Sequence, residues 1–198
     1  SFKLNKDVFG FPIQWIPKNP RWQNYVDIWT QIPLLTFVKN TVKITVVVTL
    51  LQLFTSSFAA YAFAKMQFKG KNALFLGYIA TIAVPWQAYM VPQFMMMSSW
   101  HLNNTHLAIM CLQAFSAFGV FLMKQFYEGV PTELCEAARI DGLSEYGIWW
   151  HIMLPLSLPA LSTLTIFTFV NTWTDFLGPL IYLTKTELKT IQIGLRMF

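Results

Sequence analysis

The chain has 198 residues, of which 55% are hydrophobic and only 12% are charged, and its formal net charge is +5. Soluble domains carry roughly 25% charged residues, so this composition excludes an ordinary soluble domain, and its hydrophobicity excludes a disordered chain. The Lys and Arg residues are spread along the sequence rather than gathered in one patch, which argues against a nucleic-acid binder.

The first run without charged residues covers residues 44–64. As a helix its 21 residues would be about 31 Å long, enough to cross a hydrocarbon core of about 30 Å. Ser56, Ala60 and Ala64 recur every four residues in this run. Such a stripe of small residues lets a second helix approach closely in lipid, so we predict a tightly packed membrane span here.

A second run, residues 72–123, has 52 residues without Asp, Glu, Lys or Arg. One helix cannot use that length to cross a bilayer, but two can, and the polar residues 98–106 divide the run. We therefore predict spans near residues 73–91 and 107–123. Pro85 lies inside the first of them and removes one helical hydrogen bond, so this span is expected either to break there or to end there.

Residues 124–145 hold seven charged residues and are expected to lie in water, whereas residues 146–174 are uncharged and contain a fourth span near residues 154–174. Residues 175–198 are polar enough to be a loop. Four apolar runs separated by charged segments indicate an all-α, polytopic helical membrane protein rather than a soluble protein with a buried core.

The charged segment after the third span predicts two short helices joined by a glycine turn. Pro131 suits a first helical turn, Gly142 suits the position after a helix end, and Ser144 can cap a second helix. Ala137 and Ala138 would leave a low-relief face that another protein could cover closely. An ordinary amphipathic helix at the membrane interface is the alternative.

The spacing in this segment resembles the EAA loop, E-A-A-x3-G-x9-I-x-L-P, of permease subunits of bacterial binding-protein-dependent ABC importers. Every fixed position agrees: Glu136, Ala137, Ala138, Gly142, Ile152, Leu154 and Pro155. Other stretches resemble the sugar-importer branch of the family, the maltose-permease type: Trp15-Ile16-Pro17, Asn24-Tyr25, residues 60–65 and 68–70, Pro85, and residues 102–105, 167–169, 173–176 and 190–195. One position departs, since the family often has Asn where this chain has Thr174.

The resemblance implies a six-span permease domain, of which residues 1–198 would hold the second to fifth spans, the first and last being absent. It implies that residues 1–43 are extracytoplasmic and that residues 124–153 form a cytoplasmic coupling loop. The cluster of Lys65, Lys69 and Lys71 weakly favours the same orientation, because short cytoplasmic loops are enriched in positive charge. The expected location is the bacterial cytoplasmic (inner) membrane.

The expected partners, again implied by the resemblance, are a second homologous permease, two ABC ATPases, an extracytoplasmic solute-binding protein and membrane lipid. ATP and Mg²⁺ would bind to the ATPases, this chain holding no cofactor or metal and acting as a transport subunit, not an enzyme. The residues expected to couple this chain to the ATPases are Glu136, Ala137, Ala138, Arg139, Asp141, Gly142, Ile152, Leu154 and Pro155.

Candidates for the substrate path come from polar and aromatic residues in the spans, because such groups suit sugar hydroxyls and faces: Gln87, Gln113, Asn171 and Trp173. These residues could equally serve packing, and the partner permease could hold the substrate instead. An importer of an amino acid, peptide or phosphate stays open as a rival, as does a structural subunit or receptor without a transport role. A membrane-embedded transferase is disfavoured, because Asp175, at the margin of the fourth span, is the nearest carboxylate to any span interior.

Overall fold

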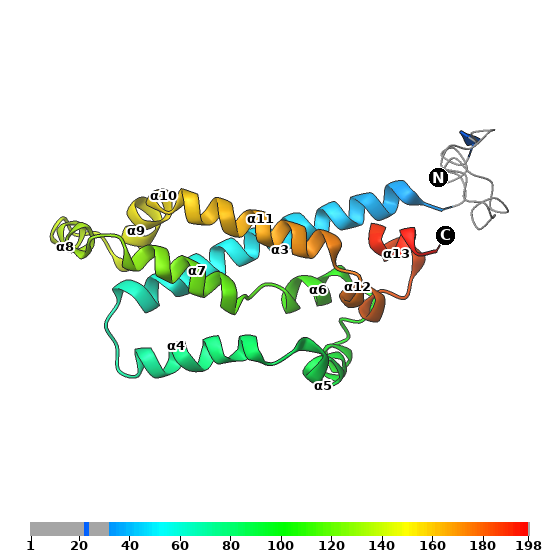
Figure 1. Cartoon of the computed structure of the whole chain (residues 1–198), viewed down its shortest axis with the longest axis horizontal. Coiled ribbons are helices and arrows are strands. Elements are labelled where there is room, and N and C mark those ends of the chain that lie inside the picture. Colours follow the sequence, from blue (N-terminus) through cyan, green and yellow to red (C-terminus); the bar gives the residue numbers. More distant parts are fainter. Residues whose placement is uncertain (1–21, 24–31, 198) are drawn as a thin grey trace, which may run out of the picture.

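A computed structural model describes residues 22–23 and 32–197, and over these residues the regular structure is helical, as predicted (Figure 1). Most of the predicted extracytoplasmic segment 1–43 lies outside the described residues. The longest helix, α3 (Leu34–Lys65), runs through the centre and packs against α7 (Ala117–Glu128) and α11 (Leu158–Thr174). It begins ten residues before the predicted span, because Lys39 and Lys43 lie exposed on the helix instead of ending it.

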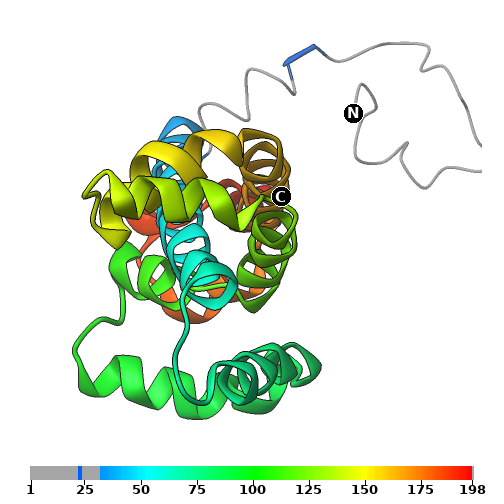
Figure 2. The same cartoon turned by 90° about the vertical axis from the view of Figure 1, so that its left-hand side faces the viewer.

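The second predicted span is broken at Pro85. Helix α4 (Lys71–Ala80) ends in the 3-10 turn η1 (Thr81–Ala83), and α5 (Trp86–Ser99) begins directly after Pro85 at an angle of 101°. The predicted break at Pro85 is therefore present, and a second helix follows it at a new angle. Figure 2 shows α4 and α5 set apart from the remaining helices, and α4 has no fully buried residue.

The third predicted span is a bent pair as well, because α6 (His106–Leu112) and α7 meet at 43°. The carbonyls of Gln113 and Ala114, freed at this bend, accept hydrogen bonds from Gln52 Nε2 and Thr55 Oγ1 of α3, each at 2.7 Å. Side chains of a neighbouring helix thus satisfy the interrupted backbone, which is how a break is tolerated inside a membrane.

The fourth predicted span begins later than expected. Short helix α9 (Glu145–Ile148), the π-helical turn η2 (Trp149–Met153) and α10 (Leu154–Leu156) form one arm, and α11 leaves it at 80°. The prediction that the span starts at residue 154 is wrong, since the bend lies at the buried Ser157, whose hydroxyl donates to the Leu154 carbonyl at 2.8 Å.

The segment predicted as a loop after the fourth span is largely helical, which corrects that prediction. It contains α12 (Leu177–Tyr182), the 3-10 turn η3 (Thr186–Leu188) and α13 (Ile191–Leu195). Long-range hydrogen bonds hold it in place: Asn104 Oδ1 accepts from the Thr184 and Lys185 amides, and Thr41 Oγ1 accepts from the Ile191 amide. Composition does not reveal such contacts between distant segments.

Two clusters of buried side chains hold the bundle together. The first includes Ala60, Tyr61 and Trp149. The second lies nearer the N-terminal end of α3 and includes Val48 and Tyr182. The predicted small-residue stripe lies against α7, where a Cβ added to Gly119 would stand 2.4 Å from Ser56 Oγ. Among the described helices α3 alone is long and apolar enough to cross a membrane by itself, and three bent pairs could add up to three further crossings.

Candidate functional site

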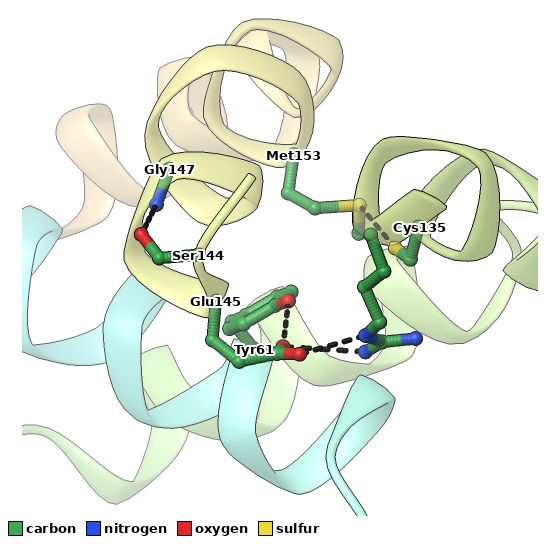
Figure 3. Close-up of polar contacts among 7 residues, drawn as sticks. Tyr61, Cys135, Ser144, Glu145, Gly147 and Met153 are labelled. Atoms are coloured by element: carbon green, nitrogen blue, oxygen red, sulfur yellow. Dashed lines mark hydrogen bonds and ion pairs between the residues drawn. The ribbon is translucent and has the colours of Figure 1, made fainter. Parts of the chain in front are cut away.

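The charged segment folds as a hairpin, residues 132–156, at one end of the molecule (Figure 1). Its first arm is α8 (Thr132–Ile140), and α9, η2 and α10 form the second. Gly142 sits in the turn at φ +84°, the Leu143 amide donates to the Ala138 carbonyl, and the Gly142 amide donates to the Arg139 carbonyl, both at 3.0 Å. This is a Schellman ending, which confirms the predicted glycine turn. Ser144 caps the second arm through the Gly147 amide at 3.2 Å (Figure 3).

The inner face of α8 is buried by the chain itself. Cys135 and Ala138 lie in the core cluster, and Cys135 Sγ is 3.8 Å from Met153 Sδ on the second arm (Figure 3). Burial raises the pKa of the Cys135 thiol, so the group stays protonated and unreactive. Ala138, expected on a face that a partner covers, is therefore unavailable for docking.

The outer face of α8 carries an exposed apolar stripe edged with acidic residues. Leu134, Ala137 and Ile140 recur every three residues, and Ile140 is 86% exposed. The carboxylates of Glu136 and Asp141 are exposed as well. Leu134 and Ile140 were missed by the sequence analysis, although their spacing from Ala137 places them on one helix face.

A polar contact joins the hairpin to the central helix. Arg139 donates from Nε and Nη2 to the two carboxylate oxygens of Glu145, at 2.7 and 3.2 Å. The Tyr61 hydroxyl of α3 donates to Glu145 Oε2 at 2.5 Å (Figure 3). The hydrogen bond to Glu145 raises the pKa of Arg139 and keeps the guanidinium charged. Arg139, expected to pair with a partner protein, is thus paired within the chain, and Glu145 was not predicted.

The remaining motif residues lie on the second arm. Ile152 and Leu154 are half-buried and pack against the first core cluster, whereas Pro155 is exposed. Ile152 and Leu154 therefore pack inside the molecule and do not belong to the exposed outer face of α8.

A cavity of about 630 Å³ lies between α3, α5, α6, α11 and α12. Aromatic rings, amides and hydroxyls dominate its wall: Gln52, Trp86, Tyr89, Gln93, Gln113, Phe115, Ser116, Phe118, Phe167, Thr168, Asn171, Thr172, Thr174, Phe176 and Tyr182. Asp175 is the one charged residue lining it within the described part of the chain. Such a mixture of rings and neutral polar groups suits a large uncharged polar ligand.

Residues 52–197 match the family model of the binding-protein-dependent transport system inner membrane component. The chain belongs to this family. This confirms the predicted resemblance, the role as a transport subunit and the inner-membrane location.

Two curated relatives of this permease transport carbohydrates. It is 37% identical to an arabinooligosaccharide transport permease of Halalkalibacterium halodurans over 98% of its own length and 71% of the relative's. It is 35% identical to a lactose transport permease of Rhizobium radiobacter over 87% of its own length and 63% of the relative's. The chain thus spans between about three fifths and seven tenths of these proteins.

A solved structure shares the fold of this permease. The crystal structure of a bacterial ABC transporter involved in the import of the acidic polysaccharide alginate superposes with a TM-score of 0.84 and 26% identity. The match covers 92% of this permease and 64% of the solved chain, which is less than two thirds of its length.

The structure brings two of the four predicted substrate residues of the permease to the cavity. Gln113 and Asn171 line it, whereas Gln87 is exposed outside the lining. Trp173 does not line it either; its ring stacks on Phe169 with centroids 5.5 Å apart. Gln87 follows Trp86 directly on α5, and successive residues of a helix point in different directions. Trp86 therefore faces the cavity while Gln87 faces away, a difference that the sequence alone did not show.

The side chain of Gln113 is already engaged within the permease. Its Nε2 donates to Asp175 Oδ2 at 2.8 Å, and its Oε1 accepts from the Thr172 hydroxyl at 3.3 Å. Gln113 therefore fixes the cavity wall. Asn171 is exposed, and no side-chain hydrogen bond joins it to the residues that the structure describes, so its amide can contact a ligand.

Helix α5 contributes aromatic residues that the sequence analysis of this permease missed. Trp86 and Tyr89 line the cavity, and Trp86 Nε1 donates to Gln93 Oε1 at 2.8 Å. They reach the cavity because Pro85 redirects α5 by 101°. Over residues 22–23 and 32–197 no group of three or more His, Cys, Asp or Glu side chains could hold a metal ion.

Proposed function

We propose that this chain forms half of the sugar translocation path of an ATP-driven importer, and that the residues lining the cavity face the substrate. The cavity lining supports this most directly, because it combines aromatic rings with amides and hydroxyls and has no basic residue in the described part of the chain. Rings can pack on sugar faces, and amides can bond hydroxyl groups. Phosphate would favour a basic site instead.

The hairpin is the proposed docking site for an ABC ATPase. The apolar stripe of Leu134, Ala137 and Ile140 can fill a groove on that partner, with Glu136 and Asp141 beside it for charge pairing. ATP and Mg²⁺ would bind on two such ATPases. Their closure would shift the permease pair from inward-open to outward-open, where a solute-binding protein delivers the sugar.

The full protein is proposed to have six spans, of which α3 and the three bent pairs supply the second to fifth. Exposed apolar side chains on α4, on α5 and on the link between them support a lipid-facing or permease-facing position for this layer: Leu74, Leu76, Ile82, Val84, Val91 and Met95. The hairpin would be cytoplasmic, and α12 and α13, at the opposite end in Figure 1, would face the outside.

Sugar uptake by the complete transporter in cells tests the proposed cargo. Asn171→Ala removes a free amide from the cavity, so uptake of a labelled neutral oligosaccharide at low concentration should fall roughly five- to tenfold, the worth of about one hydrogen bond. Asn72→Ala, an exposed residue of α4 outside the cavity, serves as the matched control and should transport normally. Uptake of amino acids or phosphate, with no carbohydrate taken up, would contradict the proposal.

A further inference from the structure

We propose that Tyr61 and Lys65 of α3 latch the hairpin to the central helix, so that movement of the docked hairpin reaches the cavity wall through α3. This inference rests on the proposed function and assigns two positioning residues that lie outside the EAA motif. Tyr61 and Lys65 are one helical turn apart and both are buried, at 2% and 8% exposure.

The two side chains bond to the segments that precede and follow α8. Lys65 Nζ donates to the carbonyl of Val130, two residues before α8 begins, at 2.5 Å. The Tyr61 hydroxyl donates to Glu145, which follows the glycine turn after α8. Helix α8 itself packs chiefly against α9. Among the described residues, these two bonds join the segments on either side of α8 to α3.

Arg139 makes this tie rigid. Its bidentate pair fixes both oxygens of the Glu145 carboxylate, and thereby orients Oε2 towards the Tyr61 hydroxyl. Bidentate guanidinium–carboxylate pairs add geometric definition as well as energy. A displacement of α8 by a docked partner would therefore be passed to α3 through this fixed contact.

Helix α3 continues from the latch to the cavity. Gln52 lies nine residues before Tyr61, about 14 Å along the helix, and lines the cavity. Its amide donates to the Gln113 carbonyl at 2.7 Å and accepts from the Thr168 hydroxyl at 2.9 Å. A shift of α3 would therefore displace the α6–α7 bend and α11 together, which is a contiguous physical route between the two sites.

Tyr61→Phe tests the latch in the complete transporter reconstituted in liposomes. The substitution keeps the buried ring and removes only the hydroxyl. We expect the ATPase to remain bound and hydrolysis to continue, while sugar transported per ATP hydrolysed falls roughly five- to tenfold. Lys65→Met, which keeps the apolar stem, should act in the same direction.

Tyr78→Phe is the matched control. Tyr78 packs against the same core cluster, and its hydroxyl makes no hydrogen bond to the residues that the structure describes. Its ratio of transport to hydrolysis should equal that of the wild type. Loss of the bound ATPase in Tyr61→Phe, or an unchanged ratio in both latch variants, would overturn the proposal.

A distance measurement tests the latch independently of any cargo. Spin labels at Thr132 of α8 and Leu50 of α3, both exposed, with Cys111→Ser as background, report the position of the hairpin relative to α3. We expect one narrow distance in the wild type that ATP does not change, and a broadened distribution in Tyr61→Phe. An equally narrow distribution in Tyr61→Phe would refute the latch, whereas absent sugar transport by the wild type would refute only the proposed function.

Discussion

Gly142 shows how one residue sets the geometry of the docking hairpin. Its φ of +84° is a conformation that a β-branched residue rarely adopts. We therefore expect Gly142→Val to distort the turn and abolish transport, while the protein remains in the membrane. Uptake measurements beside immunodetection of the membrane fraction check this.

The matched variant at this position is Gly142→Asn, since Asn tolerates the left-handed region. It should retain most of the transport activity. Equal activity in the Val and Asn variants would show that the turn conformation does not matter for coupling.

At the residue scale, local signals were predictable and distant contacts were not. The roles of Gly142 and Ser144 follow from turn and capping preferences within a few residues, and both are found in the structure. The burial of Ala138 and the pairing of Arg139 depend on the second arm of the hairpin and on α3. A sequence motif shows the spacing of its residues, but it does not show which of their side chains other parts of the same chain bury or bind.

At the scale of elements, the close approach of α3 and α7 depends on small side chains. A Cβ at Gly119 would stand 2.4 Å from Ser56 Oγ and 3.3 Å from Leu164 Cδ1. We expect Gly119→Leu to force the helices apart and destabilise the protein by about 1–3 kcal/mol or more, because the site has no room for a side chain. Thermal unfolding in detergent measures this.

Gly77→Leu on α4 provides the comparison, because a Cβ there would meet nothing within 4 Å. It should leave the midpoint of unfolding nearly unchanged. A similar loss of stability in both variants would show that the α3–α7 contact is not the weak point.

The breaks in the helices were only partly foreseeable. The break between α4 and α5 could be predicted from Pro85, because proline lacks the backbone N–H that a continuous helix needs. The α6–α7 bend follows no proline and is stabilised by Gln52 and Thr55, which lie 61 and 59 residues before the carbonyls that they bond. The bend at Ser157 lies beyond residue 154, where the fourth span was predicted to start, because an uncharged run does not show where a helix bends.

At the scale of the whole molecule, the hairpin and the segment with α12 and α13 lie at opposite ends, with α3 extending between them (Figure 1). The cavity lies beside Gln52, near the middle of α3. Charge-free runs were sufficient to predict a helical membrane protein, because a bilayer constrains composition strongly. They could not predict the cavity, which depends on how α5, α6 and α11 meet.

The outer face of the hairpin is the proposed binding site for an ABC ATPase. We would purify the intact transporter in mild detergent and identify the co-purifying chains by mass spectrometry, comparing the wild type with Ile140→Asp on the outer face and with Lys185→Glu near η3 at the opposite end. We predict that an ATPase and a second permease accompany the wild type and Lys185→Glu, and that Ile140→Asp keeps the permease but loses most of the ATPase. An ATPase retained in full by Ile140→Asp, or absent from the wild type, would contradict the account.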